Sequence, residues 1–348
     1  MSTKTSLVTS RRAALTARVV AAAATALLTV GLAACGSSGS SGSSGAPASG
    51  GSAAATDTLT MGFAQVGAES GWRTANTKSI QDSAAAAGVD LKFSDAQQKQ
   101  ENQIKAIRSY IQQKVDIIAF SPVVESGWDT VLLEAKRAQI PVILTDRSVD
   151  STDDSLYVTF LGSDFIAEGK KAGDWLVQQY QGNTAPVSIV ELQGTTGAAP
   201  AIDRKEGFTQ AISAAPNLQI VASQTGDFTR SGGKQVMEAF LKSQPKIDVV
   251  YAHNDDMGLG AIEAIEAAGK VPGKDIKIIT VDAVKDGMQA LADGKINFIV
   301  ECNPLLGPQL MDLAKQVKAG QQVPKRVVTE ETTFDQAGAQ AVLAQRQY

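Results

Sequence analysis

The sequence is poor in the residues that metal and redox sites need. It has one histidine, His253, and two cysteines, Cys35 and Cys302, among 348 residues, and these cannot supply the four ligands of a zinc site. The net charge is −4, so the basic face that nucleic-acid binding needs is missing. There is no GK[ST] triplet, which excludes a P-loop, and Gly258-Leu259-Gly260 lacks the third glycine of a dinucleotide fingerprint. We therefore expect no cofactor, no metal and no nucleic-acid partner.

Catalytic signatures are also weak. His253 has no serine, cysteine or paired-carboxylate motif around it, so a packed, hydrogen-bonded histidine is favoured over a general base. The acidic pairs Asp153-Asp154 and Glu330-Glu331 stand in predicted loops, and nothing there indicates the acid and nucleophile of a glycosidase. The sequence predicts a protein that is not an enzyme.

The first 34 residues have the features of an export signal. Arg11, Arg12 and Arg18 precede an apolar stretch over 19–32, which falls short of the roughly 20 residues of a membrane span. The tetrapeptide Leu32-Ala33-Ala34-Cys35 resembles a bacterial lipobox, in which the cysteine is diacylated and becomes the new N-terminus. Ordinary cleavage before Cys35, without lipid, is the alternative. Because Arg11-Arg12 also loosely resembles a twin-arginine signal, the export route stays open.

A flexible tether is predicted directly after Cys35. Residues 36–52 are Gly, Ser and Ala with one Pro, and such a segment has a root-mean-square reach of roughly 20 to 25 Å. We therefore predict a signal peptide at 1–34, and a lipidated Cys35 with its tether at 35–56. Two acyl chains anchor a protein stably, so lipid is the only membrane attachment expected. The body is predicted to lie on the outer face of the cytoplasmic membrane, in the periplasm or at the cell surface.

From Asp57 onward, apolar β-branched runs alternate with helical patterns. The runs begin at Leu59, Val115, Ile140, Pro186, Ile247 and Ile276. They are typical of buried parallel strands, because both faces of such a sheet are covered. Helical periodicity covers 80–87, 101–113, 128–138, 167–180, 231–241, 258–268, 284–292 and 308–317. So many elements exceed one minimal doubly wound unit, and two α/β lobes are predicted.

Polar or aromatic residues follow most of these runs. In an open parallel sheet, ligands bind in the crevice beyond the carboxyl ends of the strands. The residues expected at that edge are Trp72, Arg73, Asp146, Arg147, Asn254, Asp255 and Asp282.

Six stretches of the body resemble the periplasmic sugar-binding proteins of bacterial ABC importers. They are GFAQVGAESGWRTAN from Gly62, DAQQKQENQIKAIRS from Asp95, PVILTDRS from Pro141, ELQGTTGAAPAIDRKEGF from Glu191, SQTGDFTRSGGKQVME from Ser223 and VYAHNDDMGLGAIEAI from Val250. The resemblance is to the ribose- and galactose-binding type, and most closely to its galactofuranose-binding branch.

The resemblance implies the type I periplasmic-binding-protein fold. This α/β fold has two lobes, each a doubly wound, mostly parallel sheet flanked by helices, and three crossover hinge segments. The N-terminal lobe is expected at 57–160 with 303–331, and the C-terminal lobe at 161–302 with 332–348.

The resemblance also implies a set of ligand-binding residues. They are Glu69, Ser70, Trp72, Arg73, Asp146, Arg147, Arg204, Phe228, Asn254 and Asp282. Their chemistry suits a sugar, because aromatic rings stack on its C–H faces, carboxylates accept from its hydroxyls, guanidinium groups donate to them, and an amide does both. Asp146 and Arg147 are expected to pair, so that a dry cleft carries no lone charge.

Several of these residues have a structural alternative. Trp72 could staple the helix it opens, and Asp282 could cap the helix that follows it. Asp203-Arg204 would be a solvated helix face without the resemblance. Asp255-Asp256 is expected to cap the next helix, where carboxylates favour the dipole.

One position departs from the family pattern. In Glu301-Cys302-Asn303-Pro304, Cys302 stands where the family usually offers an amide two residues before the proline. It stays open whether Glu301 or Asn303 reaches the ligand, or neither.

We expect a monomeric, exported lipoprotein that captures a monosaccharide by hinge closure and delivers it to an ABC permease with its ATPase. Galactofuranose, or a related furanose, hexose or pentose, is the expected ligand. A sugar-sensing module for a signalling receptor is the alternative. The exact sugar, its anomer and its ring form stay open.

Overall fold

The apolar runs of the sequence form the central strands of two sheets. The computed structural model describes residues 58–348, so the predicted signal peptide and nearly all of the segment predicted at 35–56, Cys35 included, lie outside the described residues. The first sheet has the order β11-β5-β4-β3-β1-β2, and every pair in it is parallel. Its strands are β1 (Thr60–Gln65), β2 (Asp90–Asp95), β3 (Ile117–Phe120), β4 (Val142–Thr145), β5 (Thr159–Gly162) and β11 (Arg326–Val328).

The second sheet has the order β12-β10-β9-β8-β6-β7. Its strands are β6 (Val187–Gln193), β7 (Leu218–Thr225), β8 (Val249–Ala252), β9 (Lys277–Asp282), β10 (Phe298–Glu301) and β12 (Thr333–Phe334). All pairs are parallel except β10 with the short edge strand β12. The central strands β3, β4 and β8 are buried at every residue, whereas the edge strand β7 is buried only at its first residue and then has exposed and partly buried positions.

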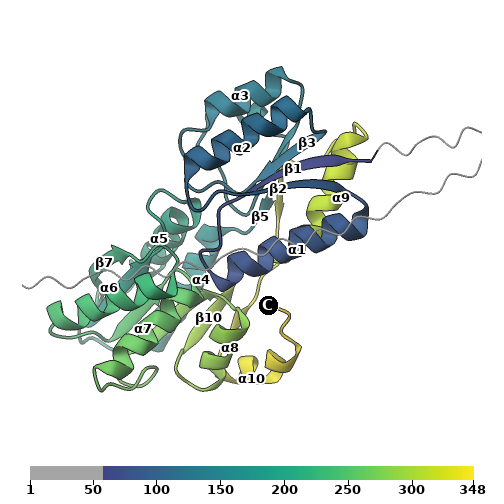
Figure 1. Cartoon of the computed structure of the whole chain (residues 1–348). Coiled ribbons are helices and arrows are strands. Elements are labelled where there is room, and N and C mark those ends of the chain that lie inside the picture. The colour runs from purple at the N-terminus through teal and green to yellow at the C-terminus, as the bar shows by residue number, and fades with distance from the viewer. Residues whose placement is uncertain (1–57) are drawn as a thin grey trace, which may run out of the picture. The chain divides into compact units, whose positions relative to one another are not determined.

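Helices cover both faces of each sheet (Figure 1). They are α1 (Gly71–Ala87), α2 (Gln100–Gln113), α3 (Asp129–Arg137), α4 (Phe165–Gln179), α5 (Ala199–Ile212), α6 (Arg230–Ser243), α7 (Asp255–Ala267), α8 (Lys285–Ala292), α9 (Gly307–Lys318) and α10 (Gln336–Val342). On the first sheet, α1 and α9 pack on one face and α2 and α3 on the other. On the second sheet, α4 and α5 cover one face, and α6, α7, α8 and α10 the other. Each sheet with its helices is called a lobe below.

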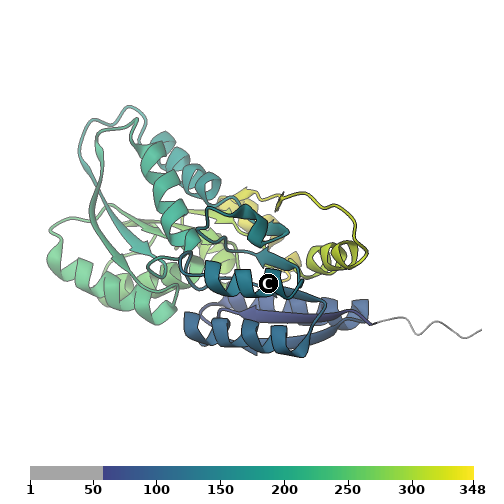
Figure 2. The ribbon, with the colours of Figure 1, turned by 90° about the horizontal axis from the view of Figure 1, so that it is seen from above.

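The chain passes between the two sheets three times. It crosses after β5, after β10 and between β11 and β12. Helix α9 returns to the first lobe, where Gly307 N donates to Ser79 Oγ of α1 across 3.1 Å, and Figures 1 and 2 show α9 in yellow-green to yellow beside the purple and blue segments. A side chain at Gly307 would collide with the carbonyl oxygen of Ser79, so glycine permits this close approach.

This topology confirms the two-lobed α/β fold. The boundaries expected at 302/303 and 331/332 fall within the second and third crossings. The boundary expected at 160/161 falls inside β5, which continues to Gly162 and pairs there with β11. Among residues 58–348, no helix combines the length and the hydropathy needed to cross a membrane.

Candidate functional site

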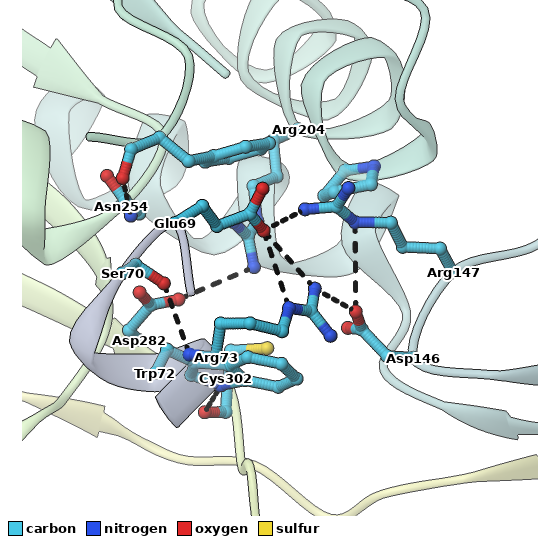
Figure 3. Close-up of a pocket in the computed structure, with 12 residues that line it drawn as sticks. Glu69, Ser70, Trp72, Arg73, Asp146, Arg147, Arg204, Asn254, Asp282 and Cys302 are labelled. Atoms are coloured by element: carbon cyan, nitrogen blue, oxygen red, sulfur yellow. Dashed lines mark hydrogen bonds and ion pairs between the residues drawn. The ribbon is translucent and has the colours of Figure 1, made fainter. Parts of the chain in front are cut away.

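A cavity lies where the carboxyl ends of strands from both sheets meet. Figure 3 shows the side chains that line it. All ten residues that the resemblance implies are among them, and the other two are Pro200 and Cys302. The space between atoms at this position is about 270 Å³, with open solvent included.

The first lobe supplies its residues from the ends of two strands, β1 and β4, which β3 separates in the sheet. Glu69 and Ser70 follow β1, and Trp72 and Arg73 stand in the first turn of α1. Ser70 caps that helix, since its Oγ accepts from Arg73 N at 3.2 Å. This cap fixes the first turn of α1, which directs the side chains of the turn at the cavity.

Four charged side chains of the first lobe form one buried network. Arg73 Nη2 lies 2.6 Å from Asp146 Oδ2, and Arg147 Nη2 lies 2.5 Å from Glu69 Oε1. The expected pairing of Asp146 with Arg147 is only a secondary contact, because Arg147 Nε lies 3.7 Å from Asp146 Oδ2. Asp146 stands at φ 61°, and its carboxylate also accepts from Ser121 Oγ. The two arginines and two carboxylates balance one another in a dry site.

Burial and neighbouring charge act differently on the two guanidinium groups. Burial lowers the pKa of Arg147, and the nearby Arg73 and Arg204 add to the effect against the pull of Glu69. At Arg73, burial also acts to lower the pKa, but Asp146 and Glu69 outweigh it and the pKa is raised. Both groups carry their charge at neutral pH.

Two polar atoms of this network have no hydrogen-bond partner among the described residues. They are Glu69 Oε2 and Arg147 Nε, and both are buried. An unpaired buried polar atom costs free energy unless something binds to it. The site therefore has one unpaired acceptor and one unpaired donor. A ligand with hydroxyl groups can pair with both, because a hydroxyl group donates as well as accepts.

The second lobe supplies one buried arginine from a helix. Arg204, in the middle of α5, donates from Nε to Glu168 Oε2 at 2.7 Å and from Nη1 to His253 O at 2.6 Å. Its Nη2 lies 3.8 Å from Asp282 Oδ1. The reading of Arg204 as part of a solvated face is therefore wrong, because its side chain is buried between the sheet and the cavity.

Burial dominates the protonation of the carboxyl groups around Arg204. It raises the pKa of Glu168 to about 8, with Arg204 opposing and Glu331 adding to the rise. It also raises the pKa of Asp282 well above its usual range, although Arg204 opposes this. A neutral Asp282 can donate to a ligand oxygen as well as accept.

Two aromatic side chains approach the cavity from opposite lobes. Trp72 Nε1 donates to Cys302 O at 2.7 Å, a contact beyond its own helix that stapling alone would not explain. The Phe228 ring lies 5.2 Å from the Arg147 guanidinium carbon. A side chain at Gly194 would collide with this ring, so glycine there lets Phe228 reach the cavity.

The remaining polar residues of the site serve the helix ends in part. Asn254 caps α7, because its Oδ1 accepts from Met257 N at 3.0 Å, while its Nδ2 donates to Phe228 O. Asp282 caps no helix: α8 follows Val284, which makes no side-chain cap, so the capping alternative is wrong.

Asp255 and Asp256 lie in the first turn of α7 and do not act as its cap. Asp255 accepts from Thr280 Oγ1 and Val284 N. Asp256 accepts from Gly71 N of the other lobe at 2.8 Å.

His253 is a packed histidine, as predicted. Its Nε2 lies 3.2 Å from Glu191 Oε1, and the ring is buried. Burial lowers its pKa, although Glu191 opposes the shift.

The position that departs from the family pattern places its cysteine at the cavity. Cys302 lines it, whereas Glu301 and Asn303 do not. Glu301 is engaged by Arg346 and Tyr348, and Asn303 Oδ1 accepts from Leu305 N. Nothing in the sequence indicates Pro200 as a cavity residue, because a proline at the start of a helix is explained by that position alone.

One cluster next to the cavity could be considered for a cation. Single ligand atoms of Glu168, Cys302 and Glu331 lie within 4.8 Å of one another. However, Arg204 already donates to Glu168, and Glu331 Oε1 accepts from Asn303 N and Thr329 Oγ1. These donors occupy one oxygen of each carboxylate, and the other oxygen of Glu168, Oε1, is buried without a hydrogen-bond partner among the described residues. Because burial raises the pKa of Glu168, the arrangement fits a proton on Glu168 better than a metal ion.

The comparisons with known proteins agree with this geometry. Residues 61–322 match the model of the periplasmic binding protein domain. The chain belongs to this family. The family consists of binding proteins, so the chain is a binding protein and not an enzyme.

Characterised relatives cover most of the chain. It is 52% identical to the galactofuranose-binding protein YtfQ of Escherichia coli K12 over 280 residues, which are 79% of this chain and 87% of the relative. Among solved structures, a Mycobacterium smegmatis protein in complex with β-D-fucofuranose is 71% identical, with a TM-score of 0.83, covering 84% of this chain and 96% of that one. The binding component of the Shewanella sp. ANA-3 arabinose ABC transporter, bound to α- and β-L-arabinofuranose, is 51% identical with a TM-score of 0.80, covering 83% and 95%.

Proposed function

We propose that this protein is the receptor of an ABC importer and that it binds a monosaccharide in its furanose form, with galactofuranose as the first candidate. The observation that carries the proposal is the cavity itself, in which the unpaired Glu69 Oε2 and Arg147 Nε lie near two aromatic rings. Relatives that are 51% to 71% identical bind galactofuranose, fucofuranose and arabinofuranose by their names. All ten residues implied by the family are proposed to contact the sugar.

The proposed mechanism is closure of the two lobes around the sugar. The lobes are proposed as 57–162 with 303–331 and 163–302 with 332–348, because β5 continues to Gly162 and the first hinge follows it. Contacts between the lobes join Trp72 to Cys302 and Gly71 to Asp256. A sugar that touches both lobes favours the closed form by its differential binding energy, and the closed form then marks the loaded receptor for the permease.

The proposed location is the outer face of the cytoplasmic membrane. The lipobox-like tetrapeptide Leu32-Ala33-Ala34-Cys35 and the Gly/Ser tether that follows it support this, because cleavage before Cys35 and attachment of a diacylglyceryl group to its thiol would anchor the protein. The receptor is proposed to act as a monomer held by lipid alone. Metabolic labelling with a fatty acid tests the anchor, because Cys35→Ala should abolish the label.

A sensing role is the second candidate. The fructose-binding periplasmic domain of the hybrid two-component system BT1754 is 26% identical and has a TM-score of 0.76. Neighbouring genes separate the two roles: a permease and an ATPase support transport, and a sensor kinase supports signalling.

The decisive experiment is a sugar panel followed by identification of the bound ring. Residues 57–348 are purified by unfolding and refolding to remove any bound sugar, then screened by thermal shift against pentoses, hexoses, polyols and sugar acids. A sugar that binds only the folded state raises the melting temperature. Carbon-13 NMR of bound [1-13C]D-galactose then reports the ring form from the anomeric signal. A bound pyranose would contradict the furanose proposal, and a flat panel would contradict the sugar receptor.

A further inference from the structure

The segment 343–348 packs against the second sheet close to the cavity. It follows α10, and its end, marked C in Figure 1, lies on the β10 side of the second lobe. Arg346 is the centre of its contacts. It donates from Nε to Ala283 O at 2.7 Å, and its Nη1 lies 2.8 Å from Glu301 Oε1. The guanidinium carbon also lies 4.2 Å from the Tyr348 ring and 5.3 Å from the Phe334 ring.

The first partner of Arg346 belongs to a turn with an unusual backbone. Asp282 stands at φ 121° and Ala283 at φ 65°, a region that residues with a side chain rarely adopt. Such a conformation persists only where the surroundings hold it. On one side, Asp255 Oδ2 accepts from Val284 N at 2.8 Å. On the other side, Arg346 holds the carbonyl of Ala283.

The second partner belongs to the neighbouring strand end. Glu301 is paired in register with Asp282, and Cys302 N donates to Asp282 O at 3.2 Å. Tyr348 Oη donates to Glu301 Oε1 at 3.0 Å. Arg346 and Tyr348 therefore tie together the ends of β9 and β10, immediately beside two residues of the cavity wall, Asp282 and Cys302.

We propose that Arg346, assisted by Tyr348, is a positioning residue for ligand binding, which holds the Asp282–Val284 turn and the Glu301–Cys302 strand end in the binding geometry. Arg346 does not line the cavity and acts through these two strand ends. Its planar fork serves a carbonyl and a carboxylate at once, which a lysine cannot reproduce. The inference rests on the proposed sugar-binding function.

The test compares Arg346→Ala with Arg108→Ala. Arg108 also forms a two-pronged pair with a glutamate, Glu134, but on the surface of the first lobe. Hydrogen exchange of the sugar-free proteins measures the turn directly. In Arg346→Ala, the amides of Val284 and Cys302 should exchange about tenfold faster than in the wild type, because the adjacent Ala283 carbonyl and Glu301 side chain are no longer held in place. Amides of β3 in the first sheet should be unchanged.

The same variants are titrated calorimetrically with D-galactose, D-fucose and L-arabinose. Arg346→Ala should lower the affinity for whichever of these sugars the wild type binds by about tenfold. Arg346→Lys and Tyr348→Phe should lower this affinity by less, and Arg108→Ala should leave it unchanged. Faster exchange with unchanged affinity would reduce Arg346 to a structural role, and unchanged exchange would overturn the inference outright. If the wild type binds none of the three sugars, the proposed ligands are wrong, and the exchange measurement still decides whether Arg346 orders the cavity wall.

Discussion

Glu168 accepts a hydrogen bond from Arg204 at 2.7 Å, with both side chains buried. Glu168 also lies within 4.8 Å of a carboxylate oxygen of Glu331. Glu331 stands in the third crossing, where Ser163 Oγ of the first crossing donates to it. Two carboxyl groups this close cannot both ionise without cost, so this contact couples a cavity arginine to the protonation of a group at the hinge.

The pH dependence of folding stability tests the proton on Glu168. Burial raises the pKa of Glu168 from 4.5 to about 8, so the folded protein keeps a proton that the unfolded chain releases. The contribution of this group is complete below pH 4.5 and is lost as the pH rises to 8. Glu168→Gln imitates the protonated group. Over this pH range its free energy of unfolding, measured in urea, should therefore fall less steeply than that of the wild type, and the two slopes should differ by up to about 1.4 kcal/mol per pH unit.

Glu134→Gln is the matched control for this measurement. Glu134 is a surface residue whose pKa is lowered by its hydrogen bonds with Arg108, so its loss should leave the slope above pH 4.5 unchanged. Equal slopes in Glu168→Gln and the wild type would show that Glu168 is ionised in the folded protein.

Arg147 is predicted to be a ligand contact with little role in folding. Arg147→Ala should weaken sugar binding by more than about tenfold, because it removes a buried charged donor. Its partner Glu69 keeps a contact with Arg73 at 3.4 Å, so the near-ultraviolet circular dichroism should stay that of the wild type. Calorimetric titration provides the affinity, with the exposed Arg137→Ala as control. An unchanged affinity would remove Arg147 from the site.

Trp72 is predicted to report closure by its fluorescence. Its indole donates to Cys302 O at the second crossing, whereas Trp128 and Trp175 pack against Phe120 and Phe298 within the lobes. Sugar binding should therefore change the tryptophan emission of the wild type and leave that of Trp72→Phe nearly constant. The variant retains a ring for stacking but loses one hydrogen bond, so its affinity should fall by only about threefold to tenfold. Persistence of the full emission change would assign the signal to another tryptophan.

The sequence predicts those parts of the site that strand ends determine. Asp146, Asn254 and Asp282 directly follow or end apolar runs, and the carboxyl ends of parallel strands meet at one edge. The residue types alone therefore indicate which side chains meet at the cavity.

Helix residues of the site could not be predicted in this way. Arg204 and Glu168 occupy positions of α5 and α4 that resemble solvated faces, and only the packing of these two helices buries them against each other. Gly169 and Gly207 permit that packing, since a side chain at either would collide with the backbone of the other helix. For Arg204 the family resemblance supplied the role, and for Glu168 and Arg346 nothing in the local sequence did.

The contact between Asp256 and Gly71 is predicted to set how long the closed form lasts. Asp256 Oδ2 accepts from Gly71 N at the start of α1, across the two lobes, where free amide groups and the helix dipole favour a carboxylate. This bond exists only while the lobes are together, so Asp256→Ala should increase the sugar dissociation rate by about fivefold to tenfold and change the association rate much less. Stopped-flow measurement of Trp72 fluorescence gives both rates. Asp286→Ala is the matched control, because Asp286 shares the partner Arg230 with Asp256 but contacts nothing in the first lobe among the interactions of residues 58–348. An equal increase of the dissociation rate in both variants would assign the effect to Arg230. An increase in Asp256→Ala alone would identify the bond to Gly71 as the contact that stabilises the closed form.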